Sequence, residues 1–301
     1  MNSNNNNVLD DKFEVSGKRL ATTSTSAAVR RLRRKITLMI AIPVAVSLAA
    51  LLLFVWPGYL RKAKAPESGV FDPITTPVVT AGLDTLGRTD VTTSFTERLD
   101  TVINDVRLAI FIPHNATAEL TIGAPDINDS SIILAAQAAD IRADNGKILG
   151  AFVLKGEPKA WGLSKKGYCA IIDGVITVGV SDNSPLFEEA TDKGGYFFRQ
   201  YPLVDNGQLV DNEPKNKTMR KALCARGGQT FMVVSLTDES FHDFAQALVD
   251  LGVDNAIYLV GGYAASGWLR DEDGQVTGFA ATTQHRVYKN ESYILWRVSI
   301  P

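Results

Sequence analysis

An uncharged apolar run near the N-terminus constrains the organisation of this chain more than any other feature. The run covers residues 36–56, and about 20 apolar residues are what an α-helix needs to cross the hydrocarbon core of a membrane. Pro43 would damage a soluble helix but is tolerated in a membrane helix, and Trp56 and Tyr59 stand where interfacial aromatic residues are common. We therefore expect one transmembrane helix over residues 36–56.

Basic residues before the run predict its orientation. Five Lys/Arg residues lie between positions 30 and 35, and clustered positive charge favours the cytoplasmic side of a membrane. We therefore expect residues 1–35 to be a disordered basic cytoplasmic tail, with a single-pass anchor in the inner (plasma) membrane. A cleaved signal peptide is the alternative. We favour an uncleaved anchor because the run is long and the A-x-A-like site at 63–65 contains a Lys.

Beyond the anchor, the chain divides near residue 90 into a linker and an acidic body. Residues 57–90 are rich in Pro, Gly, Ser and Thr, as is typical of an extracytoplasmic linker. Residues 91–301 are numerous enough for one globular domain. From residue 66 onward the chain has 20 Lys/Arg against 30 Asp/Glu. Because nucleic-acid binding depends on basic side chains that neutralise phosphates, we expect no nucleic-acid partner.

The clearest folding pattern of the body is a helix followed by a buried strand and a Gly-Gly turn. Apolar residues recur at helical spacing over residues 238–251, with Thr237 as a possible N-cap. The apolar run 256–260 is too short for a helix and predicts a central strand buried on both faces. Gly261-Gly262 then lets a ligand approach the backbone closely, or simply forms a tight turn.

Several other segments have strand patterns. Residues 168–172 and 175–180, joined by Asp173-Gly174, are the strongest hairpin signal. A second hairpin is predicted from residues 106–112 and 116–122. Further strands are predicted at 231–235 and 293–298, and the apolar run 132–139 fits either a strand or a helix. Because strands outnumber helices, we predict a mixed-sheet α+β domain.

Metal, nucleotide and disulfide chemistry have little support in the sequence. The three His residues are far apart and share no metal-ligand spacing, so no metal site is predicted and no cofactor is identified. Cys169 and Cys224 either form one disulfide in an oxidising compartment or remain buried free thiols, and both alternatives stay open.

Polar and aromatic residues in three segments suggest a sugar phosphate site. Asp140, Arg142 and Asp144 lie in the first, Arg199 follows two Phe residues in the second, and Arg220 lies in the third. Arg binds phosphate with paired donors, aromatic rings stack on sugar faces, and carboxylates act as acids or bases in glycosyl chemistry. Each residue alone is more often a surface ion pair or a core aromatic than part of a binding site.

The order of segments resembles the phosphodiester glycosidase family. Residues 195–207, which include Pro-Leu-Val-Asp-Asn-Gly, precede Arg220-Lys221-Ala222, and the helix, strand and Gly-Gly turn follow. In that family a Pro-Leu-Val-x-x-Gly segment precedes an Arg-Thr-Ala-like segment and then a strand ending in Leu-Asp-Gly-Gly-Gly-Ser. The likeness covers roughly residues 130–270. It implies the fold of that family and hydrolysis of a sugar-phosphodiester bond.

The chain also departs from the family pattern at positions that matter for catalysis. Val260 stands in place of the family's Asp, and Tyr263 in place of its third Gly. The family's Asn-Gly-Gly-Phe-Phe segment has no match, and residues 138–142 occupy its place. The resemblance therefore implies either lost catalysis or an acid that has moved to Asp140 or Asp144. The predicted substrate-binding residues are Arg142, Arg199, Arg220, Gly261, Gly262, Tyr263 and Ser266.

These observations lead to two hypotheses about function. The first is a membrane-anchored extracytoplasmic hydrolase that cleaves a sugar-phosphodiester bond in an envelope or exported glycan. The second is a catalytically inactive, membrane-tethered module that binds a glycan or a protein partner. The low Cys content and the absence of a clear signal peptide are typical of a bacterial envelope or periplasmic protein.

Overall fold

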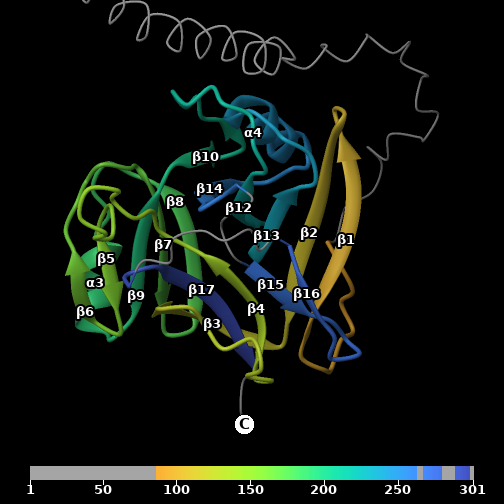
Figure 1. Cartoon of the computed structure of the whole chain (residues 1–301), viewed down its shortest axis with the longest axis horizontal. Helices are drawn as coiled ribbons and strands as arrows, with labels where there is room; N and C mark the ends of the chain where they lie inside the picture. Colours follow the sequence, from red (N-terminus) through yellow and green to blue (C-terminus); the bar gives the residue numbers. More distant parts are fainter. Residues whose placement is uncertain (1–85, 263–266, 280–288, 299–301) are drawn as a thin grey trace, which may run out of the picture. The chain divides into compact units, whose positions relative to one another are not determined.

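The largest sheet of the domain contains the strand that the sequence predicts to be central. The computed structural model describes residues 86–262, 267–279 and 289–298. Within them, β14 (Asn255–Leu259) is an interior strand, and four of its five residues are buried. The sheet has the order β1-β2-β13-β12-β14-β10-β11 (Figure 1). Its other strands are β1 (Phe95–Ile103), β2 (Val106–His114), β13 (Gln229–Ser235), β12 (Lys221–Arg226), β10 (Pro202–Asp205) and β11 (Gln208–Leu209).

Two five-stranded sheets complete the strand framework. One has the order β16-β15-β4-β17-β3 and the other β6-β5-β9-β7-β8. The first consists of β16 (Val276–Gly278), β15 (Gly267–Arg270), β4 (Ile132–Gln137), β17 (Ser292–Val298) and β3 (Ala116–Ile122). The second consists of β6 (Glu157–Ala160), β5 (Phe152–Leu154), β9 (Tyr196–Gln200), β7 (Gly167–Ile172) and β8 (Val175–Val180). The prediction of a sheet-rich fold is confirmed, and the apolar run 132–139 forms a strand.

The inner strands β2, β13, β12 and β14 of the seven-stranded sheet are buried on both faces, which explains their continuous apolar sequences; the edge strand β1 alternates between buried and exposed residues. In β2, Ala109 and Phe111 join the core shared with the two smaller sheets, whereas Leu108 and Ile110 face the other side. That other side packs against α4 (Phe241–Asp250), which lies over the sheet in Figure 1. Because both faces are covered, these strands lack the polar alternation of half-exposed strands.

The helix α4 begins later than its apolar spacing predicts. Ser240 is its N-cap, and the Ser240 hydroxyl accepts a hydrogen bond from the backbone N–H of Asp243. The prediction of Thr237 as N-cap was wrong, because residue 239 is extended and pairs with Thr218 in an isolated bridge. The residues just before Ser240 fit the helical pattern but are held outside the helix by this bridge.

We expect Ser240→Ala to lower the free energy of unfolding by about 1 kcal/mol, the usual cost of losing an N-cap side chain. Urea unfolding followed by circular dichroism measures the change. Thr89→Ala is the matched control, because the exposed Thr89 hydroxyl has no hydrogen bond within the described ranges. An equal loss in both variants would contradict the capping role of Ser240.

The predicted hairpin of residues 106–122 is also wrong. β2 pairs with β1 and β13, whereas β3 pairs with β17 in a different sheet. The chain leaves the first sheet at Asn115, which has a left-handed φ of 48° and whose side-chain amide donates hydrogen bonds to the carbonyls of Val91 and Thr93. An alternating apolar pattern predicts strands, but it does not specify their partners.

The second predicted hairpin is confirmed. β7 and β8 pair directly, and the turn residues Asp173 and Gly174 have φ of 52° and 78°. These left-handed values belong to the two-residue turn that matches strand twist, which is why Asp-Gly is favoured there. The short helix α3 (Leu186–Asp192) follows β8 and packs on this sheet through Ala190.

The alternatives for the two cysteines are also resolved. Cys169 and Cys224 are both free and buried, and burial raises the pKa of each thiol. The predicted transmembrane helix at 36–56, the tail before it and nearly all of the linker lie outside the described residues. Among the residues that are described, no helix has the length and apolar character to span a membrane.

Candidate functional site

Three of the predicted site residues meet around Tyr258, at the end of β14. The Tyr258 hydroxyl lies so close to Gly261 that a Cβ atom at residue 261 would overlap it. The Arg220 side chain hydrogen-bonds with Tyr258, and the Asp140 carboxylate is near enough to act on its charge. We call this group the Tyr258 cluster. Its members are Asp140, Lys165, Gln200, Arg220, Tyr258 and Gly261.

Asp140 is held by a buried lysine. The Lys165 side chain is 1% exposed and its ammonium forms an ion pair with the Asp140 carboxylate, which is 27% exposed. Lys165 Nζ also donates to Gln200 Oε1 at 2.7 Å and lies 4.4 Å from the centre of the Tyr201 ring. Burial lowers the pKa of Lys165, and the charge of Asp140 opposes this. The result is a carboxylate that is fixed on one side and open to solvent on the other.

Arg220 fixes the tyrosine rather than facing solvent. It is 2% exposed, its Nε donates to the Glu239 carbonyl at 2.9 Å, and its Nη2 donates to the Asn216 carbonyl. Its guanidinium also lies 4.1 Å from the centre of the Phe241 ring. Burial raises the pKa of Tyr258, and the charge and hydrogen bond of Arg220 act in the opposite direction. Arg220 therefore orients Tyr258 and supplies positive charge to the cluster.

The other predicted residues lie in different surroundings. Arg142 and Asp144 form an exposed ion pair of 2.9 Å with each other, and Arg199 lines a cavity on the sheet that contains β9. Gly262 has a φ of 80°, and its N–H donates to the Met219 carbonyl at 2.8 Å. Tyr263 and Ser266 are outside the described residues. No cluster of three or more potential metal ligands occurs in the described part of the chain.

Lys165, Gln200 and Tyr258 are cluster members that the sequence did not identify as site residues, and Tyr258 was recognised only as part of the apolar strand. Lys165 lies in a loop with no apolar periodicity, and Gln200 ends a strand of aromatic residues. The only sequence feature that Lys165 and Gln200 share is a polar side chain next to apolar segments. This feature is too common in proteins to identify site residues.

A second lysine lies beside Arg220 but on the opposite face of β12. Lys221 is fully buried, and its Nζ is 5.9 Å from the centre of the Phe279 ring. Burial lowers the pKa of Lys221 from 10.5 to about 7. Between these two pH values the unfolded chain binds more protons than the folded chain, so Lys221 makes stability rise with pH.

We therefore expect the stability of Lys221→Met relative to the parent to fall as pH rises from 7 to 10.5. Below pH 7 the parent must bury a charged ammonium and the variant need not, whereas near pH 10 that difference disappears. The slope is on the order of 1 kcal/mol per pH unit at most. Urea unfolding of both proteins at pH 6, 8 and 9.5 measures it, and a difference that is independent of pH would contradict the prediction.

Comparisons with known proteins agree with the order of segments. The family model for phosphodiester glycosidases matches residues 134–294. The zebrafish N-acetylglucosamine-1-phosphodiester alpha-N-acetylglucosaminidase catalytic domain, solved as auto-inhibited by its pro-peptide, is 14% identical; the match covers 71% of this chain and 86% of that one, with a TM-score of 0.48.

A hypothetical protein from Synechocystis is likewise 14% identical, over 70% of this chain and 65% of that one, with a TM-score of 0.50. This likeness concerns the fold alone. No curated protein matches by sequence. The family model spans more than half of the chain and includes most of β4, all of β9, β12 and β14, and the start of β17. The chain therefore belongs to the phosphodiester glycosidase family.

Proposed function

We propose that this protein is a membrane-anchored extracytoplasmic hydrolase that cleaves a sugar-phosphodiester bond in an envelope or exported glycan. The observation that carries the proposal is the Tyr258 cluster, in which one partly exposed carboxylate lies among two cations and a tyrosine on a chain of this family. The uncharged run 36–56 and the basic residues before it support the anchor and its orientation.

In the proposed reaction, Asp140 acts as the base. The oxygen of a water molecule bonds to the anomeric carbon of the sugar, and the water proton passes to the Asp140 carboxylate. The bond between the anomeric carbon and the phosphate oxygen breaks, and the phosphate monoester leaves with the electron pair. Because the leaving group is already an anion, it requires nearby positive charge more than a proton donor.

The rest of the cluster meets these requirements. Lys165 pairs with the Asp140 carboxylate and orients it, and Arg220 brings positive charge to the Tyr258 hydroxyl. Tyr258 can donate a hydrogen bond to the developing anion, and charges at such buried positions act more strongly than in water. Gly261 has no Cβ atom, and this allows the Tyr258 hydroxyl to lie against the backbone at that position.

The position of the broken bond provides the test. The full chain is incubated with sugar-1-phosphodiesters in water enriched in ¹⁸O, beginning with an N-acetylglucosamine series. We expect ¹⁸O at the anomeric carbon of the released sugar and none in the phosphate monoester. Label in the phosphate would mean attack at phosphorus and would refute the glycosidase mechanism.

Val260 is the observation that favours the second candidate, an inactive glycan- or partner-binding module. It is partly buried, follows β14 directly and stands where the family pattern has Asp. A folded protein that binds these diesters but releases no sugar, with or without added divalent metals, would support this candidate over the hydrolase.

A further inference from the structure

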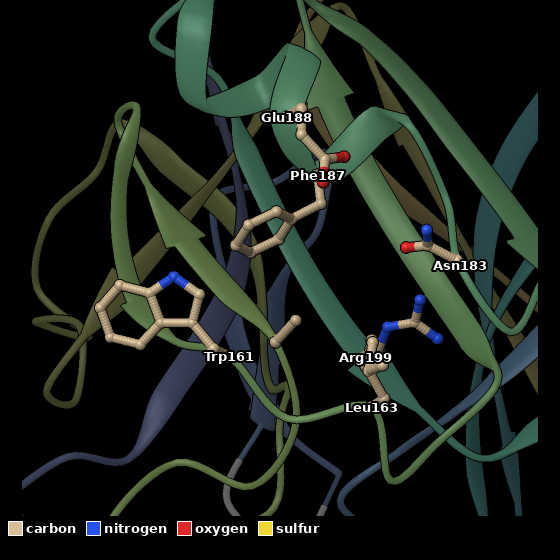
Figure 2. A pocket seen from close by; sticks show the side chains of 7 residues that line it. Trp161, Leu163, Asn183, Phe187, Glu188 and Arg199 are labelled. Carbon is tan, nitrogen blue, oxygen red and sulfur yellow. The ribbon is translucent and has the colours of Figure 1, made fainter.

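A cavity of about 200 Å³ lies next to the sheet that contains β9, and none of its lining residues belongs to the Tyr258 cluster. Figure 2 shows the side chains of Trp161 and Phe187 toward one side of it and those of Asn183 and Arg199 toward the other. Ligand pockets for drug-sized molecules usually span roughly 300–1,000 Å³. This volume therefore fits a single ring rather than a larger ligand.

Exposed apolar side chains contribute to the lining of the cavity. Trp161 is 70% exposed and Leu163 is 67% exposed, which places them among the most exposed large hydrophobic residues of the described chain. Phe187 is held in place by an edge-on contact with Phe197, with ring centres 5.6 Å apart. Large apolar side chains that gather at a cavity instead of in the core indicate a binding surface.

Polar groups without partners also line the cavity. The side chains of Asn183 and Glu188 are exposed, and within the described ranges neither makes a hydrogen bond or ion pair. Arg199 is 1% exposed and its Nε is buried without a hydrogen-bond partner. The Asn183 amide and the Glu188 carboxylate are therefore available to hydroxyl groups of a ligand, whereas the enclosed Arg199 Nε is not.

The loop that carries Trp161 and Leu163 also carries Lys165 of the Tyr258 cluster. Arg199 Nη1 donates to the Lys165 carbonyl at 2.7 Å, while the Lys165 ammonium binds Asp140. The same loop packs closely at Gly162, where a Cβ atom would lie 3.1 Å from the Gly150 Cα atom. A ligand in the cavity therefore contacts a segment that is fixed to the proposed catalytic carboxylate.

We propose that this cavity is an accessory carbohydrate subsite that takes one sugar ring of the glycan. A sugar ring has an apolar face, which suits Trp161, and a rim of hydroxyls, which suits the amide of Asn183 and the carboxylate of Glu188. A purely apolar ligand would leave the Asn183 amide and the Glu188 carboxylate without hydrogen-bond partners. The inference rests on the proposed function for its assumption that the ring is part of the same substrate.

Binding of free monosaccharides tests the subsite directly. The probes are glucose, mannose, galactose and N-acetylglucosamine. Their binding to the full chain is measured by saturation-transfer NMR in a detergent whose headgroup is not a sugar. We expect at least one probe to bind, and Trp161→Ala to weaken its binding by about tenfold or more. Trp161→Phe keeps a ring and should retain much of the affinity. Ile127→Ala, which alters a hydrophobic residue that is 47% exposed but outside the cavity, should change nothing.

Asp140→Asn separates this inference from the proposed hydrolase. A probe that binds Asp140→Asn as tightly as the parent, but not Trp161→Ala, supports the subsite even if no diester is hydrolysed. Hydrolysis that depends on Asp140, without any sugar binding that depends on Trp161, overturns the subsite and leaves the hydrolase intact. Equal loss of binding in the Asp140 and Trp161 variants would mean that the sugar occupies the Tyr258 cluster, which also overturns the subsite.

Discussion

Asp140→Asn should lower kcat for diester hydrolysis by about 100- to 10,000-fold, the range that a positioned acid or base contributes. The substitution keeps the shape of the side chain but removes the proton acceptor. Its other expected effect is on Lys165, which is 1% exposed and would lose its ionic partner. Thermal unfolding of the variant must therefore be measured beside its kinetics, so that lost catalysis is distinguished from lost folding.

Asp144→Asn is the matched control. It makes the same chemical change four residues away, at a carboxylate that is 59% exposed and pairs with the exposed Arg142. Exposed ion pairs contribute little to stability, and we expect activity within about twofold of the parent. If Asp144→Asn were the more damaging change, or if a folded Asp140→Asn hydrolysed the diester normally, Asp140 would not be the catalytic base.

Gly261→Ala should both destabilise the domain and reduce activity. A Cβ atom at this position would overlap the Tyr258 hydroxyl and lie 2.9 Å from the Met219 carbonyl oxygen. Neither neighbour moves freely. Tyr258 is 8% exposed and hydrogen-bonded to Arg220, and the Met219 carbonyl accepts a hydrogen bond from the Gly262 N–H. Overpacking of this kind costs about 1–3 kcal/mol, and displacement of the hydroxyl should lower kcat as well.

Two further variants show whether overlap with the Tyr258 hydroxyl causes the loss of stability in Gly261→Ala. In Tyr258→Phe the hydroxyl is absent, so Gly261→Ala should cost less stability in that background than in the parent. Gly278→Ala is the control for the substitution itself, because among the described residues its Cβ atom would meet only the Gly267 carbonyl oxygen, at 3.8 Å. Equal destabilisation at residues 261 and 278 would contradict the proposed close packing around Tyr258.

Local patterns in the sequence predicted individual elements well and their partners poorly. The apolar run before Gly261 gave a buried interior strand because its surroundings, a helix on one face and a core on the other, leave no place for polar alternation. The segments on either side of Asn115 were both recognised as strands. Their assignment to different sheets depends on partners outside the segment: β2 pairs with the preceding strand β1 and with the distant β13, whereas β3 pairs with the distant β17.

The candidate site has a similar limit. Asp140, Arg220 and Gly261 could be singled out because a family pattern passes through or near them. Lys165 could not, because what makes it important is the absence of solvent around its ammonium and the nearness of Asp140. Both are properties of the folded chain. Conversely, Arg142 and Asp144 have the appropriate residue types but lie at the surface.

The position of β17 has a consequence for how this domain folds. This strand contains residues 292–298, yet it lies between β4 and β3, whose sequences end more than 150 residues earlier. During synthesis, β3 and β4 must therefore wait with their facing edges unpaired until almost the whole domain has been made. Contacts of such long sequence separation slow folding, and open strand edges favour association between chains. The late arrival of β17 thus makes this sheet the part of the molecule that most depends on protection while folding is incomplete.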